Sequence, residues 1–206
     1  MILEELISAI LQLLAFTLIP FLVYIIRQRS VKGFFQYIGL KPSNRKANAW
    51  ALATSLIFII GAMGLVFISP DFKEALTAPG SITGKFRAMG FGVEAVVALL
   101  LIALIKTSLA EEILFRGFLA KRLIHVLGFQ WGNLLQAAIF GLIHLLLFIS
   151  ITSSFFFPAF IFVFSGLGAY ISAYINEKMA DGSIIPGWIA HGLANVVSYS
   201  VMGFLI

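Results

Sequence analysis

Apolar stretches of about 20 residues alternate with short polar segments along most of the chain. A helix of about 20 residues rises roughly 30 Å, the thickness of the hydrocarbon core of a bilayer. The stretches lack the alternation of membrane β-strands, which are about 10 residues long. The pattern therefore predicts an all-α, polytopic transmembrane bundle of about six spans in one integral membrane domain, residues 1–206. The predicted spans are residues 6–26, 49–69, 88–110, 131–151, 155–175 and 184–206.

The segments between the spans differ in charge. Residues 27–48 carry six basic side chains and no acidic one, whereas residues 70–87 are mixed in charge, contain Gly and Pro, and are predicted to form a loop. Residues 176–183 are also predicted to be a loop. With six spans, ten basic residues fall on one side of the membrane and three on the other. The more basic side is predicted to face the cytoplasm, with both termini outside.

The composition supports a membrane location. The chain is 61% hydrophobic and 11% charged, with a mean hydropathy of +1.04, whereas soluble domains carry about 25% charged residues. The net charge of +5 does not indicate nucleic acid, because the basic residues gather between spans, as expected for membrane topology and contact with anionic lipids. The absence of cysteine excludes disulfides, thiolate metal sites and a cysteine nucleophile.

Ionisable and amide side chains nevertheless lie inside three of the apolar stretches. They are Glu111, Glu112, Arg116, His144, His191 and Asn195. A charged side chain at bilayer depth costs about 2.5–3.5 kcal/mol, so such groups persist where they are paired, line a water-filled cavity or take part in chemistry. Glu112 and Arg116 are four residues apart and can pair along a helix, while Glu111 lies about 100° around it. We therefore expect one polar site between helices, in a cavity open to the cytoplasm.

Two kinds of hydrolytic site use these residue types. In the first, a carboxylate and a histidine activate water, and a second histidine with an amide donates to the developing oxyanion without a metal. In the second, Glu111, His144 and His191 bind a zinc ion as a His₂Glu set. The sequence contains no HExxH motif, so that helix-encoded form of zinc site is absent. The metal-free arrangement is favoured and zinc remains the alternative.

The three polar segments together resemble a known family. Glu111-Glu112-x-x-Phe115-Arg116-Gly117, Phe140-x-x-x-His144 and His191-x-x-x-Asn195 are similar to the motifs of the CPBP family. This is the CAAX-protease and bacteriocin-processing group of intramembrane endopeptidases, also called the Abi family. The resemblance covers about residues 100–201. It implies that Glu111 and His144 activate water, that His191 and Asn195 stabilise the oxyanion, and that Glu112 and Arg116 orient the site.

The resemblance also implies the setting of the reaction. The substrate would be a membrane-associated peptide or protein, and the enzyme a multi-pass protein of the cell membrane in contact with lipids. The chain is shorter than the eukaryotic CAAX proteases, which favours a prokaryotic relative acting in bacteriocin or pheromone maturation, or in self-immunity. Two alternatives stay open: a non-enzymatic immunity or scaffold protein of the same fold, and a small proton-coupled transporter. The chain shows no convincing internal repeat, which counts against the transporter.

Overall fold

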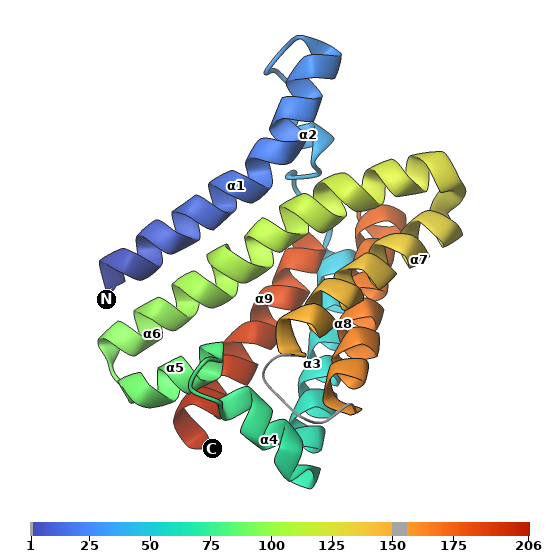
Figure 1. Ribbon diagram of the computed structural model, residues 1–206. Coiled ribbons are helices and arrows are strands. Elements are labelled where there is room, and N and C mark those ends of the chain that lie inside the picture. Colours follow the sequence, from blue (N-terminus) through green and yellow to red (C-terminus); the bar gives the residue numbers. More distant parts are fainter. Residues whose placement is uncertain (1, 150–155) are drawn as a thin grey trace.

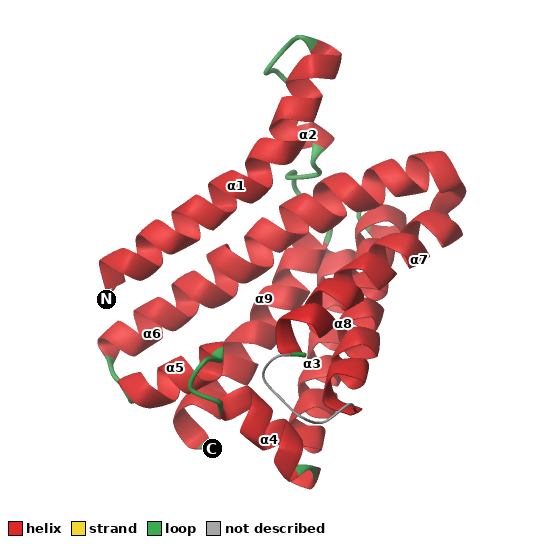
Figure 2. Cartoon of the chain, in the orientation of Figure 1, coloured by secondary structure: helices red, strands yellow, loops and turns green. Residues whose placement is uncertain are grey.

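The computed structural model describes residues 2–149 and 156–206, and every regular element in this part of the chain is helical (Figure 2). Five helical stretches are long and apolar enough to cross a membrane. They are Ile2–Gln28, Arg45–Ile68, Val93–Phe148, Phe156–Met179 and Ile185–Leu205. The prediction of an all-α, multi-pass membrane protein is therefore confirmed.

The longest stretch, Val93–Phe148, makes two passes. Its 56 residues would extend about 84 Å as one straight helix, nearly three times the hydrocarbon thickness. The backbone reverses at Gly128, where φ is 76° and ψ is 167°, a conformation that glycine adopts without the steric cost of a Cβ. Figure 1 shows the chain doubling back between α6 (Val93–Leu100) and the end of α7 (Lys121–Phe148). Counted as two arms, this stretch gives the described residues six helical segments long enough to cross a membrane. The predicted span ends at residues 151 and 155 lie outside the described residues.

The segment predicted to be a loop, residues 70–87, instead contains two short helices. They are α4 (Pro70–Thr77) and α5 (Ile82–Met89). The prediction was wrong because Pro and Ser here begin helices: Pro70 occupies the first turn of α4, and Ser81 caps α5 by accepting from the Gly84 N–H. The third span consequently begins at Val93, about five residues later than predicted.

The first arm of the long helical stretch, residues 93–127, is the central helix of the bundle. It lies between α1 (Ile2–Gln28) and α9 (Ile185–Ser200), as Figure 1 shows. The opposite face of α9 packs against α3 (Arg45–Ile68). Helix α8 (Phe156–Tyr174) packs along α7. The helix that carries the two glutamates therefore packs directly against the helix that carries His191 and Asn195.

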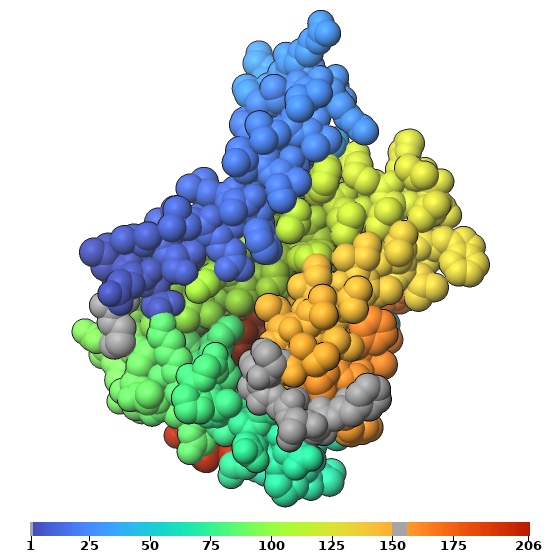
Figure 3. Space-filling view, in the orientation of Figure 1, coloured from blue at the N-terminus to red at the C-terminus, as the bar shows by residue number. Residues whose placement is uncertain are grey.

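The basic segment after α1 projects beyond the helical body (Figure 3) and packs at its base against the loop that leads into α9. The Ile184 N–H donates to the Gly39 carbonyl at 2.9 Å, and Ser183 Oγ donates to the Lys41 carbonyl at 2.6 Å. The same loop is held from the central helix, because Lys121 Nζ donates to the Gly182 carbonyl at 2.7 Å. These bonds fix the start of α9 relative to the central helix, and with it the position of His191.

Candidate active site

Glu112 is fully buried at the centre of the bundle and is surrounded by polar partners. Its Oε1 lies 3.3 Å from Nε of Arg116, one turn along the helix, as the spacing predicts. Its Oε2 accepts hydrogen bonds from Ser172 Oγ at 3.2 Å and Asn176 Nδ2 at 3.5 Å. Arg116 is only 3% exposed. A buried ion pair persists when the remaining polar atoms are also satisfied. Ser172 and Asn176 satisfy Oε2, whereas Oε1 has the Arg116 ion pair but no hydrogen bond within the described residues.

Gly187 closes this environment from α9. A Cβ at Gly187 would lie 2.3 Å from Glu112 Oε2 and 2.4 Å from Ser172 Oγ, so the close approach requires glycine. The Gly187 N–H donates to Asn176 Oδ1 at 2.9 Å. Asn176 was expected in the loop 176–183, but α8 continues as a π-helical turn, Ile175–Met179, and buries it completely. The loop prediction was wrong there because polar residues end an apolar span without ending the helix.

The His191 ring lies between the two glutamates. Its Nδ1 is 3.6 Å from Glu112 Oε1, and its Nε2 is 3.9 Å from Glu111 Oε2. Both separations are too long for direct hydrogen bonds. Glu111 Oε2 and His191 Nδ1 are buried atoms without a hydrogen-bond partner among the described residues. The structure thus brings Glu111, Glu112 and His191 together, and leaves Glu111 the less engaged of the two carboxylates.

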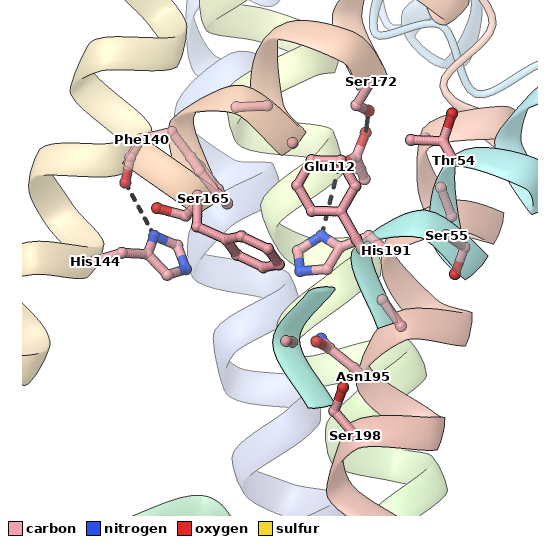
Figure 4. A pocket seen from close by; sticks show the side chains of 18 of the residues that line it. Thr54, Ser55, Glu112, Phe140, His144, Ser165, Ser172, His191, Asn195 and Ser198 are labelled. Atoms are coloured by element: carbon pink, nitrogen blue, oxygen red, sulfur yellow. Dashed lines mark hydrogen bonds and ion pairs between the residues drawn. The ribbon is translucent and has the colours of Figure 1, made fainter. Parts of the chain in front are cut away.

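His144 joins the site from α7. Its Nδ1 lies 2.9 Å from the Phe140 carbonyl oxygen. A carbonyl can only accept, so the proton of this bond is on Nδ1 and the neutral ring keeps Nε2 as an acceptor. The Phe140 ring lies among these groups, with its centroid 4.3 Å from that of the His144 ring, tilted by 36°, and 6.3 Å from that of the His191 ring (Figure 4). The Arg116 guanidinium carbon lies 4.1 Å from the same centroid. Phe140 therefore forms a shared apolar surface beneath the polar groups.

Asn195 lies one turn after His191 on α9. Its Nδ2 donates to Thr107 Oγ1 at 3.0 Å and to Ser108 Oγ at 3.2 Å. The sequence pattern did not single out these two hydroxyls, although they precede Glu111 and Glu112 by four residues each and so share a helical face with them. That spacing is the signal that would have found them. The turns on either side of Glu111, Leu101–Leu109 and Glu112–Ala120, are π-helical, a distortion frequent at functional sites.

A cavity of about 230 Å³ joins these groups. Its polar lining comprises Glu112, Arg116, His144, His191 and Asn195, with the hydroxyls of Thr54, Ser55, Ser165, Ser172 and Ser198. Its apolar lining from α3, α7 and α8 includes Phe58, Ile59, Phe140, Phe148, Ile161 and Phe164. Figure 4 shows the histidines and Glu112 gathered around one space. Five of the six polar residues predicted to share a site line it. Glu111 instead faces the other edge of the His191 ring.

The side chains as they lie do not form a zinc site. A catalytic zinc needs three protein ligands at about 2.0–2.2 Å from one point. Among residues 2–149 and 156–206, no group of three or more His, Asp or Glu side chains is arranged to hold one ion. His144 directs Nδ1 to its own helix, and the two nitrogens of His191 face different glutamates.

Comparisons with known proteins agree with the motifs. The model of the family described as type II CAAX prenyl endopeptidase Rce1-like matches residues 93–197, which contain all six polar site residues. No curated protein and no solved structure matches the chain. The matched segment covers just over half of the 206 residues and coincides with the region expected to form the catalytic core. The chain therefore belongs to the Rce1-like type II CAAX prenyl endopeptidase family.

Proposed function

We propose that this membrane protein is an endopeptidase that hydrolyses a peptide bond of a membrane-associated peptide or protein, with Glu111 as the base that activates water. The observation that carries the proposal is the position of His191, 3.9 Å from Glu111 and 3.6 Å from Glu112 beside a cavity between membrane-crossing helices. Hydrolysis needs a base, a donor for the oxyanion and a space for the peptide. The cavity supplies the space and the donor His191, and Glu111, beside the cavity on the other edge of the His191 ring, supplies the base.

The two glutamates divide these tasks by their partners. Glu112 is engaged by Arg116, Ser172 and Asn176, so its lone pairs are largely committed and its role is to orient His191. Glu111 Oε2 accepts no hydrogen bond from the described residues. Glu112 Oε1 accepts none either, but it is in an ion pair with Arg116 at 3.3 Å. A general base needs such an uncommitted oxygen to take a proton from water. These contacts support Glu111, rather than Glu112, as the base.

The two histidines would act on different groups in the reaction, His191 on the carbonyl oxygen of the substrate and His144 on the attacking water. A water bound to Glu111 is also within reach of His191 Nε2, which in its protonated form can donate to the carbonyl oxygen as negative charge develops there. His144, whose Nδ1 is bonded to the Phe140 carbonyl, keeps Nε2 as a second acceptor for the water. The water oxygen bonds to the carbonyl carbon while Glu111 takes the proton. The C–N bond then breaks and the leaving nitrogen receives that proton.

The cavity lining indicates an apolar substrate segment, since the walls from α3 and α8 carry Phe58, Ile59 and Phe164. The family description names prenylated CAAX proteins as substrates of relatives. The proposed substrate is an unprenylated peptide of a prokaryotic cell membrane, which would enter the cavity from the cytoplasm. Bacteriocin or pheromone precursors belong to this class.

Alanine variants test the proposal. Glu111→Ala, His144→Ala and His191→Ala would each be reconstituted in liposomes with quenched membrane-inserting peptides, with and without a farnesylated CAAX end. We expect turnover to fall at least about 100-fold. Glu94→Ala, an exposed substitution at the start of the same helix, is the matched control and should keep turnover. Wild-type turnover by all three variants contradicts the proposal. Retained immunity in cells with Glu111→Ala would instead support the non-enzymatic alternative.

A further inference from the structure

Ser55 on α3 has a buried hydroxyl that bonds to no residue in the described part of the chain. The residue is 2% exposed, and its Oγ has no hydrogen-bond partner. Three other serines among residues 2–149 and 156–206 are similarly buried, and the hydroxyl of each donates a hydrogen bond. Those bonds run from Ser108 to the Ala103 carbonyl, from Ser172 to Glu112, and from Ser183 to the Lys41 carbonyl.

The bond that a helical serine often makes is missing at Ser55. Such a hydroxyl can donate to the carbonyl oxygen one turn earlier, as Ser165 does to Ile161 at 2.6 Å and Ser200 to Val196 at 2.7 Å. Ser55 makes no such bond within α3. An unpartnered buried hydroxyl destabilises a protein, most of all within a membrane, where water cannot replace the partner. A bound molecule that supplies the missing acceptor removes this cost.

Close packing of α3 does not require the hydroxyl. Ala47 and Ala51 precede Ser55 by eight and four residues, so they share its helical face, and both are buried without a polar side-chain atom. Alanine at position 55 would provide a side chain of the same small size and would leave no donor unsatisfied. The hydroxyl therefore has an explanation other than helix packing.

Ser55 lines the cavity of the candidate active site (Figure 4). Helices α3 and α9 begin at the same end of the bundle (Figure 1), where hydrogen bonds join residues 39–41 to residues 183–184. Ser55 lies ten residues after the start of α3, and His191 lies six residues after the start of α9. At 1.5 Å per residue, Ser55 is therefore about 6 Å further from this end than His191.

The lining around Ser55 indicates which substrate group would need its hydroxyl. The neighbouring walls carry Phe58, Ile59 and Phe164, so a peptide enclosed there meets mainly apolar side chains. A helical peptide satisfies its own main chain, whereas an extended peptide needs other partners for its carbonyls. An extended chain advances about 3.3 Å per residue, so a distance of about 6 Å corresponds to roughly two residues.

We propose that Ser55 Oγ donates to a main-chain carbonyl of the extended substrate, about two residues from the scissile bond. The inference rests on the proposed endopeptidase function. It assigns a substrate-binding residue outside the segment 93–197 that matches the family model. The bond keeps the substrate extended beside His191, because a carbonyl held by Ser55 is not available for a helical hydrogen bond within the substrate.

Ser55→Ala tests this role against a matched control. We expect KM for the quenched membrane peptide to rise about tenfold with kcat nearly unchanged, the size of one lost hydrogen bond in binding. Ser200→Ala removes a hydroxyl that already bonds within α9 and should keep wild-type KM. The melting temperature of Ser55→Ala should stay the same or rise, because an unpartnered buried hydroxyl is removed. A wild-type KM or a lower melting temperature in Ser55→Ala would overturn the inference.

Ester-substituted substrates locate the carbonyl through a double-mutant cycle. In each peptide of a series, one amide bond near the scissile bond is replaced by an ester, whose carbonyl is a weaker acceptor. We expect one ester, about two residues from the scissile bond, to raise KM about fivefold in the wild type and less than about twofold in Ser55→Ala. Equal effects of every ester on the two proteins would count against a bond from Ser55 and overturn the inference.

Peptide binding without turnover separates this inference from the proposed function. Glu111→Gln protein in nanodiscs would be titrated with the fluorescent membrane peptide, with and without the added substitution Ser55→Ala. We expect Kd to be about tenfold higher for the double variant. Equal Kd values would overturn the inference. A Kd that depends on Ser55, together with wild-type protein that cuts no peptide, would support the contact and overturn the proposed function instead.

Discussion

Gly187 lies against the buried carboxylate of Glu112, with room for a hydrogen but not for a side chain. An added Cβ would meet Glu112 Oε2 at 2.3 Å and Asn176 Nδ2 at 2.7 Å. The first turn of α9 is thereby pressed onto the central helix, and His191 follows one turn later on the same helix. The position of His191 relative to the two glutamates thus depends on the absence of a side chain at Gly187.

Gly187→Ala is predicted to impair the protein through this contact. The methyl group must push Glu112 or Ser172 away, which we expect to destabilise the fold by about 1–3 kcal/mol and to reduce turnover more than tenfold. Thermal unfolding in detergent and peptide cleavage measure the two effects. Gly64→Ala on α3 is the matched control, because a Cβ there meets no atom within 4 Å. Equal effects of the two substitutions would contradict the prediction.

Glu112→Gln and Glu111→Gln should damage different properties. Neutralising Glu112 leaves the buried Arg116 charge without its partner, at a cost of about 3–5 kcal/mol, so the melting temperature should fall. Glu111 has no comparable ion pair with an arginine, and Glu111→Gln should keep the melting temperature while abolishing turnover. A destabilised Glu111→Gln variant together with a stable but inactive Glu112→Gln variant would contradict this assignment and would favour Glu112 as the base.

Asn176→Asp is predicted to be harmful although it keeps the shape of the side chain. The substitution replaces the NH₂ group that donates to Glu112 at 3.5 Å with a second carboxylate oxygen, so two acceptors meet in a buried place. We expect a loss of about 1–3 kcal/mol in unfolding free energy and lower turnover. Asn48→Asp, at the less enclosed start of α3, serves as the comparison. Wild-type stability of Asn176→Asp would show that the bond to Glu112 contributes nothing.

Metal removal should leave turnover unchanged. A glutamate can take a proton from water without an ion, and the described residues include no group of three His, Asp or Glu side chains arranged to hold one. Turnover measured with and without 1,10-phenanthroline, alongside elemental analysis of the purified protein, tests this. Loss of activity in the chelator and its recovery with zinc would support the His₂Glu alternative of Glu111, His144 and His191.

Apolar runs of bilayer length were sufficient to predict the helical fold, and the polar side chains inside them marked the candidate site residues. Apolar runs of bilayer length have one stable outcome, a spanning helix, and polar groups within them stand out because of their cost. The pairing of Glu112 with Arg116 follows from helical spacing alone. The segment 70–87 was harder, since Pro and Ser end some helices and begin others, and only packing against the bundle distinguishes the two.

The surroundings of the site could not be predicted in the same way. Ser172, Asn176 and Gly187 meet Glu112 only because α8 and α9 converge on the central helix, and their spacing in the sequence contains no sign of that convergence. The motif resemblance identified the candidate residues, whereas the tertiary contacts are what support the proposed division of roles between Glu111 and Glu112.

Cleavage in ¹⁸O-labelled water tests the central claim most directly. Wild-type protein, Glu111→Gln and Glu94→Gln would be incubated in proteoliposomes with an unprenylated membrane-inserting peptide, and the products analysed by mass spectrometry. The account predicts that wild type and Glu94→Gln release an amino-terminal fragment with one ¹⁸O in its new carboxylate, and that Glu111→Gln releases none. Labelled fragment produced by Glu111→Gln at the wild-type rate would contradict it.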